Sequence, residues 1–139
     1  MPPRAAVSAA RKPVDEKITI NLGYVDLGQI DLLVQEGFYS NRSDLIRTAI
    51  RNQLGVHADL VKQTVSRRML TMGLQHFSRE DLERVKASQE KLHIQALGLV
   101  RIADDVSAQL ALATIASISV LGALQASPAV RKALADRIS

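Results

Sequence analysis

The 139-residue chain contains no cysteine and no tryptophan, and aromatic residues make up only 3% of it. Without cysteine there is no disulfide framework, no thiolate zinc site and no cysteine nucleophile, which agrees with a reducing compartment such as the cytoplasm. Hydrophobic residues nevertheless reach 47% of the sequence. A sizeable core can therefore form, and it has to be built from aliphatic side chains.

Patterns that carry catalysis or bind metals are also missing. The sequence has no nucleophile and base constellation, no glycine-rich phosphate loop and no HExxH motif, so we expect no enzyme and no cofactor. His57, His76 and His93 form no close pair, which gives poor support to a soft metal site. A solvated turn before a helix explains Asp104-Asp105 at least as well as a site for a hard cation does. We therefore expect no metal.

Two segments bear on targeting. Residues 106–130 lack charge and are long enough on paper to span a bilayer, but their polar residues, proline and many alanines make a weak membrane segment. Residues 1–16 contain basic and small residues without the continuous apolar stretch of a secretory signal, so we predict a disordered arm there. We expect no membrane partner.

The charge of the chain is mildly basic, with a net charge of +4 and a pI near 9.8. This excess is compatible with nucleic acid but does not require it. Basic and acidic residues nearly balance over residues 1–56. Any affinity of this part for nucleic acid must therefore depend on where its charges lie.

A short strand is predicted near the N-terminus. Residues 17–22, KITINL, alternate polar and apolar side chains and are rich in β-branched residues, which is typical of a half-buried strand. One face of this strand is apolar, and the other carries Lys17, Thr19 and Asn21.

Two helices are predicted after the strand. The first begins after Gly23 and ends at Gly37, a residue suited to the left-handed conformation at a helix end. The second has Asn41 or Ser40 as its N-cap and stops at Gly55. Because a lone strand cannot satisfy its own backbone groups, a partner chain must supply the second strand.

The strand, the first helix and the stretch GFYSNRSDLIRTAIRNQL resemble the ribbon-helix-helix family of the Arc, MetJ and CopG type over residues 17–54. The most specific element is G-x-Y-x-N-R-S-D-x-I-R, from Gly37 to Arg47. The resemblance implies a bacterial-type DNA-binding regulator in which two chains intertwine and their strands form an antiparallel ribbon that lies in the major groove.

The resemblance also implies DNA contacts. Lys17, Thr19 and Asn21 match the family's base-reading positions, and their side chains can pair with base edges in the major groove. The start of the second helix, at Asn41, Arg42 and Ser43, offers free N–H groups and the positive end of the dipole to a phosphate. Asn41 and Ser43 are also simply good helix-start residues, and Lys17, Thr19 and Asn21 could be a solvated face. We expect Arg51 to be a solvated surface charge. We expect Arg47 to pair with another residue of the same subunit or of its partner.

A repeat is visible after Gly55. The segments MLTMGLQHFSREDLERV, IQALGLVRIADDVSAQL and ISVLGALQASPAVRKAL each place a glycine between aliphatic residues and follow it with a helix-start signal, and the glycines are 25 and 24 residues apart. This spacing predicts strands near 67–76, 93–102 and 117–125, with helices near 79–91, 105–116 and 128–137. Such βα units favour parallel strands with helices on one face. One alanine-rich helix remains the alternative for residues 109–124.

The fold class expected from these patterns is α+β. We expect four parts: an arm over residues 1–16, an intertwined ribbon-helix-helix module over 17–54, a linker or helix extension over 55–64, and a small βα-repeat oligomerisation domain over 65–139.

The expected function is sequence-specific DNA binding in transcriptional control, with repression as the family's usual mode. The expected partners are double-stranded DNA and the chain itself as a homodimer, with tetramers or larger assemblies left open, in the cytoplasm and associated with the nucleoid. One alternative is an antitoxin that autoregulates its operon, with a toxin as partner, although an antitoxin tail is usually disordered when free. Another is a DNA-tethered assembly protein that polymerises through its C-terminal domain.

Overall fold

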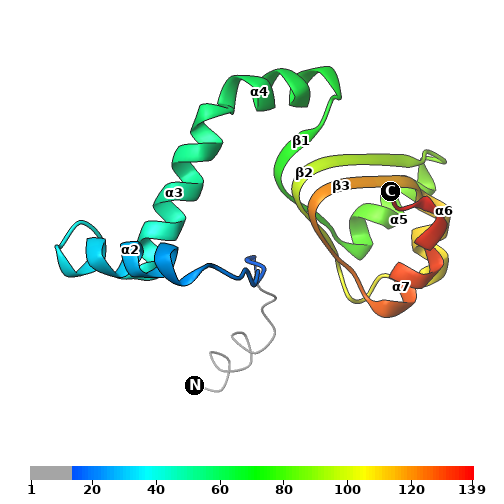
Figure 1. Cartoon of the computed structure of the whole chain (residues 1–139). Helices are drawn as coiled ribbons and strands as arrows, with labels where there is room; N and C mark the ends of the chain where they lie inside the picture. The colour runs from blue at the N-terminus through cyan, green and yellow to red at the C-terminus, as the bar shows by residue number, and fades with distance from the viewer. Residues whose placement is uncertain (1–13) are drawn as a thin grey trace, which may run out of the picture. The chain divides into compact units, whose positions relative to one another are not determined.

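The computed structural model describes residues 14–139, which divide into two compact units. The boundary lies between Ala58 and Asp59. We call the parts on either side the N-terminal unit and the C-terminal unit and describe each by itself (Figure 1).

The N-terminal unit contains two helices, α2 (Tyr24–Gln35) and α3 (Arg42–Val56). The chain leaves α2 through Gly37, whose φ is +85°, while the Phe38 N–H donates to the Leu33 carbonyl oxygen at 3.0 Å. The predicted left-handed glycine at this helix end is therefore confirmed. Helix α3 runs one residue past the predicted stop at Gly55, because glycine is tolerated within a helix at a modest cost.

The segment predicted as a strand, residues 17–22, lies in neither a helix nor a strand in this single chain. All six side chains are exposed, and the apolar Ile18 and Ile20 are 80% and 62% exposed. The predicted pairing requires a second chain, so it stays a prediction.

No residue of the N-terminal unit from 14 to 58 is buried. Helices α2 and α3 contact one another, but apolar side chains on both remain in solvent, among them Leu32, Ile50 and Leu54. Burial of apolar surface is the main favourable contribution to folding. The unit taken alone therefore lacks a core.

A third helix, α4 (Ala58–Arg67), follows α3 after a single turn residue. The segment predicted as a linker or helix extension is thus mostly helical. The first strand of the repeat was expected near residue 67, but it begins at Thr71 because α4 continues through Arg67 and the chain then turns at Met69, whose φ is +55°.

The C-terminal unit alternates strands and helices as the repeat predicts. Its three strands are all parallel and lie in sequence order, β1-β2-β3, with a helix after each. The elements are β1 (Thr71–Phe77), α5 (Arg79–Ala87), β2 (Leu92–Ile102), α6 (Ala108–Thr114), β3 (Ile115–Gln125), α7 (Pro128–Ala133) and the 3-10 helix η1 (Ala135–Arg137).

Each of the three helices begins at a serine cap. The side chains of Ser78, Ser107 and Ser127 accept hydrogen bonds from the backbone N–H three residues later. Asp81 completes a capping box by accepting from the Ser78 N–H at 3.0 Å. The predicted starts at Ser78 and Ser127 are confirmed. Helix α6 starts later than expected because its cap is Ser107.

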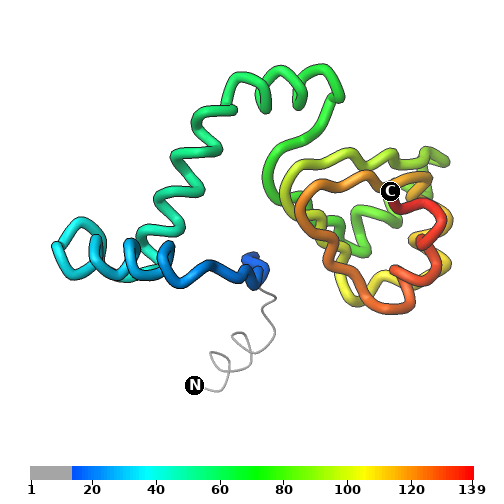
Figure 2. Tube along the Cα trace, viewed as in Figure 1, coloured from blue at the N-terminus to red at the C-terminus, as the bar shows by residue number. Residues whose placement is uncertain are grey.

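The three glycines of the repeat lie side by side, with Gly73 paired to Gly98 and Gly98 to Gly122. All three have positive φ, between +110° and +138°. A Cβ on Gly98 would lie well under 3.0 Å from the Gly73 carbonyl oxygen, and one on Gly122 equally close to that of Gly98. The three strands follow the same curved path (Figure 2), and they can lie side by side there only with glycine at positions 98 and 122.

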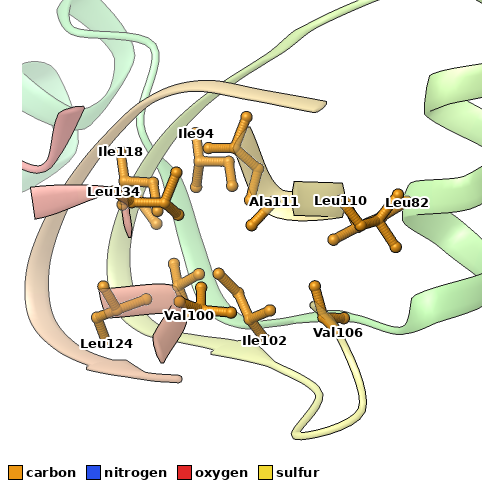
Figure 3. Close-up of a cluster of buried hydrophobic side chains, with 13 residues drawn as sticks. Leu82, Ile94, Val100, Ile102, Val106, Leu110, Ala111, Ile118, Leu124 and Leu134 are labelled. Atoms are coloured by element: carbon orange, nitrogen blue, oxygen red, sulfur yellow. The ribbon is translucent and has the colours of Figure 1, made fainter. Parts of the chain in front are cut away.

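The core of the C-terminal unit lies between the sheet and its helices. α5, α6 and α7 occupy one face of the curved sheet (Figure 1), and the buried side chains from strands and helices meet there (Figure 3). Thirteen apolar residues are buried, including Leu82 of α5, Val100 of β2 and Val130 of α7. Residues 106–130 are divided among α6, β3 and the start of α7, and no helix in the described range 14–139 is long and apolar enough to cross a membrane.

Replacing Gly122 by alanine should unfold the C-terminal unit at a markedly lower denaturant concentration. The new methyl group would overlap the Gly98 carbonyl oxygen in addition to adopting an unfavourable φ. Gly73→Ala is the matched control, because its Cβ meets nothing within 4 Å and only the backbone strain of about 1–3 kcal/mol remains. Urea unfolding followed by circular dichroism measures both. Equal losses in the two variants would contradict the importance of the close approach.

Candidate nucleic-acid interface

The start of α3 is built by reciprocal hydrogen bonds around its N-cap. Asn41 is the cap, with extended φ and ψ of −166° and 177°, and its Oδ1 accepts from the Asp44 N–H at 2.8 Å. The Asp44 carboxylate in turn accepts from the Ser40 N–H at 2.9 Å. Of the two caps that the sequence allowed, the structure selects Asn41.

Two N–H groups remain directed out of the helix start. The first intrahelical bond runs from the Leu45 N–H to the Asn41 carbonyl oxygen, and Asp44 donates to the cap. The N–H groups of Arg42 and Ser43 precede these bonds, at the positive end of a 15-residue helix. A phosphate oxygen is the type of acceptor that such a helix start binds.

Arg42 pairs with a carboxylate of the neighbouring helix. Its Nε and Nη2 donate to the two oxygens of Asp31 in α2, each at 2.8 Å. This hydrogen bond from the Arg42 guanidinium holds the pKa of the Asp31 carboxyl below its usual value. A guanidinium has five N–H donors, so the pair leaves Arg42 able to reach a second anion.

The Arg42–Asp31 pair fixes α2 to the start of α3. Since the folded-state pKa of Asp31 is lowered, the pair contributes stability above the unfolded value of about 3.9 and loses it as the pH falls through the folded-state pKa. Both side chains are about half exposed, so the contribution is that of a surface pair. The main consequence is positional, because Arg42 is held beside the free N–H groups.

The three predicted base-reading residues lie before α2, on a different segment from the helix start. Lys17, Thr19 and Asn21 are all exposed, and they alternate with the apolar residues of the same segment. The structure of one chain thus brings Asn41, Arg42 and Ser43 together at α3. It leaves Lys17, Thr19 and Asn21 as a separate exposed set.

Two further arginines of α3 line a hollow of about 680 Å³ together with the start of the described chain. Its lining combines Arg47 and Arg51 with Asp15 and Glu16, and it also includes Val14 and Ile18. These opposite charges suit the pairing role expected for Arg47. Arg51 shares the hollow with the same carboxylates, which the sequence did not indicate.

Sequence reasoning missed the partner of Arg42. Asp31 lies 11 residues away on another helix, and no periodicity links the two positions. The only available signal was that the two residues belong to consecutive helices. The three histidines gather no ligand set, since no group of three His, Cys, Asp or Glu suitable for a metal is found among residues 14–139.

Comparison with known proteins extends the resemblance beyond the short motif. A model of the ribbon-helix-helix transcriptional regulator family matches residues 13–131, which cover both units. No curated protein and no solved structure matches the chain. The sequence motif covers only residues 17–54, whereas the family match continues to residue 131, within the C-terminal unit. The chain therefore belongs to the ribbon-helix-helix transcriptional regulator family.

Proposed function

We propose that the protein is a sequence-specific DNA-binding repressor that acts as a homodimer. The observation that carries the proposal is the absence of any buried residue between 14 and 58 in a single chain, although this segment holds the predicted strand and the helices α2 and α3 within the family match. Two such units would bury Ile18, Ile20 and the exposed faces of the helices against each other.

The proposed dimer reads DNA with its ribbon. Pairing of two segments 17–22 would turn the apolar side chains toward the helices and leave Lys17, Thr19 and Asn21 facing outward. A two-stranded ribbon fits the major groove, where lysine can bind guanine and asparagine can bind adenine. The cap at α3, with Asn41, Arg42 and Ser43, then anchors the ribbon to the phosphate backbone.

The C-terminal unit supports a regulator more than an antitoxin. Its thirteen buried apolar residues give it a core of its own, whereas a toxin-binding tail is usually disordered before it binds. We assign this unit to self-association of the regulator. Between residues 71 and 125, which hold its three strands, no two basic residues are adjacent, and this gives little support to a second DNA contact.

Alanine at Lys17, Thr19 or Asn21 should reduce discrimination between operator and random DNA. Each good bidentate contact that is lost costs about 1–3 kcal/mol, while folding is retained because the side chains are exposed. The operator can be selected from random duplexes and the variants compared by competition titration. Lys62→Ala, an exposed lysine of α4, is the control. Full selectivity in all three variants would show that the ribbon is not the reading surface.

Arg42→Ala should weaken binding to all duplexes alike and make the salt dependence shallower by about one phosphate contact. Asp31→Asn should have the opposite effect, because it releases the guanidinium from its carboxylate partner. Binding isotherms at several salt concentrations measure both variants. Arg84→Ala, at an exposed arginine of α5, controls for net charge. A change in base preference with Arg42→Ala would contradict a role in anchoring.

The N-terminal unit should melt at a temperature that falls on dilution, because its core exists only in the dimer. The chain allows this to be followed without truncation, since its only two tyrosines, Tyr24 and Tyr39, both lie in the N-terminal unit and it has no tryptophan. Tyrosine fluorescence during heating at a series of protein concentrations reports the melting. A transition independent of concentration would contradict the dimer.

A further inference from the structure

The two ends of the C-terminal repeat are finished differently. At the β3 end the chain adds α7, whose Val130 is fully buried, and then returns along the sheet edge, where Ile138 bridges to Ile118 in parallel. The Ser139 N–H donates to the Ile118 carbonyl oxygen at 2.8 Å. Arg137 secures this return by donating to the carbonyl oxygens of Leu112 and Ile115, both at 2.8 Å.

The β1 end has no such cap within the C-terminal unit. β1 is paired only with β2, so the backbone groups along its other edge have no strand beside them within this sheet. β1 contributes no buried residue to the core, whereas β2 contributes four. Terminal repeats of such arrays normally need a capping element.

A hollow of about 470 Å³ lies along β1 and the first residues of β2. β2 begins before β1, since the first β1 residue, Thr71, pairs with Ala96, and this leaves residues 92–95 without a neighbour on that side. Thr71, Gln75, Phe77 and Leu92 line the hollow. The Gln75 Oε1 is buried and, among the described residues, has no hydrogen-bond partner. A buried acceptor left unpaired is costly, which favours a donor supplied from outside the unit.

We propose that the β1 edge is the self-association surface of the C-terminal unit and that its partner is the β1 edge of a second copy. This proposal names the surface for the proposed self-association. It depends on the proposed N-terminal dimer only for the affinity of the contact, because the dimer brings two β1 edges close together. The two strands run antiparallel around a two-fold axis perpendicular to the sheet, which gives a six-stranded sheet with both helical layers on the same face. Met72 and Leu74, which are 60% and 56% exposed in one chain, then lie at the centre of that sheet.

The cap at β3 is the reason for this partner. Head-to-tail stacking would place β1 of one copy on β3 of another, and this arrangement grows without limit. Ile138 and Ser139 already pair with Ile118 near the start of the β3 edge, so another copy cannot pair along the whole of that edge. The β1 edge has no such block within the C-terminal unit, and when it pairs with its own copy it forms a closed pair.

The size of the contact explains why it needs the rest of the chain. A seven-residue strand is about 23 Å long, and such an edge buries less than the ~800 Å² per partner of a standard stable complex. Chains already joined through their N-terminal units present their β1 edges to each other at high effective concentration. The edge contact then forms without a large interface.

Cysteine cross-linking in the full chain tests the proposal, because the chain has no native cysteine and a single introduced one can join only to its copy. Cα atoms facing each other across antiparallel strands are about 4.5–5.5 Å apart, which suits a disulfide. We expect Met72→Cys or Leu74→Cys to form covalent pairs under mild oxidation several-fold faster than Leu121→Cys. Leu121 is the matched control, since it lies in register with Leu97 and Met72 and is 48% exposed but belongs to β3.

Lysine substitution provides a second measurement. Leu74→Lys should lower the assembly mass in light scattering, or raise the concentration at which the assembly dissociates, while Leu121→Lys should not. Retained binding of Leu74→Lys to a single operator separates this result from a failure of the proposed DNA-binding function. The β1 contact would be overturned if both lysine variants lowered the assembly mass equally, or if Leu121→Cys cross-linked faster than Met72→Cys and Leu74→Cys. It would also be overturned if no variant changed the assembly mass or formed covalent pairs. The last result would mean that the β1 edge does not pair with a second copy.

Discussion

Apolar side chains and strand edges are stabilised by a second surface that covers them. In each unit of this chain, some of these groups are left uncovered. The N-terminal unit places both helices and its extended segment in solvent, with no buried residue between 14 and 58. The C-terminal unit buries one face of a parallel sheet under three helices but leaves one sheet edge uncovered. The same physical requirement therefore explains the proposed ribbon and the proposed edge contact.

The two units differ in how much apolar surface they bury within a single chain. The N-terminal unit has no core in a single chain, so in the proposed dimer folding and association would be one process. The C-terminal unit has an aliphatic core of thirteen buried residues. Its uncovered part is the edge of a terminal strand, as at the end of a repeat array. Under the proposed function, the chain combines a DNA-reading part that folds on pairing with a second part that has its own core.

The sequence predicted much of the fold, because its signals were local. The glycine spacing located all three strands, and Asn41, Ser78 and Ser127 marked helix starts that the structure confirms. The element ends were less accurate. The last helix was expected to reach residue 137, but α7 stops at Ala133 and a 3-10 turn follows, so that Ile138 can reach β3.

The candidate site was harder to predict because its contacts join distant positions. Arg42 could have met any of several carboxylates, and only the packing of α2 on α3 selects Asp31. The cap formed by the last two residues leaves no periodic trace in the sequence. In the proposed ribbon, the strand that pairs with residues 17–22 belongs to another molecule, so the sequence of one chain carries no signal for the contact.

The glycine row also limits how this protein family can change in length. Each glycine accommodates the carbonyl oxygen of the one before it, so an insertion of one or two residues within a strand would misalign the row and place a side chain against the neighbouring backbone. An insertion of one whole unit of about 25 residues between β2 and β3 would bring its own glycine into line and its own helix into the layer. Gene duplication within this region can therefore extend the array by entire units, while small insertions are confined to the loops.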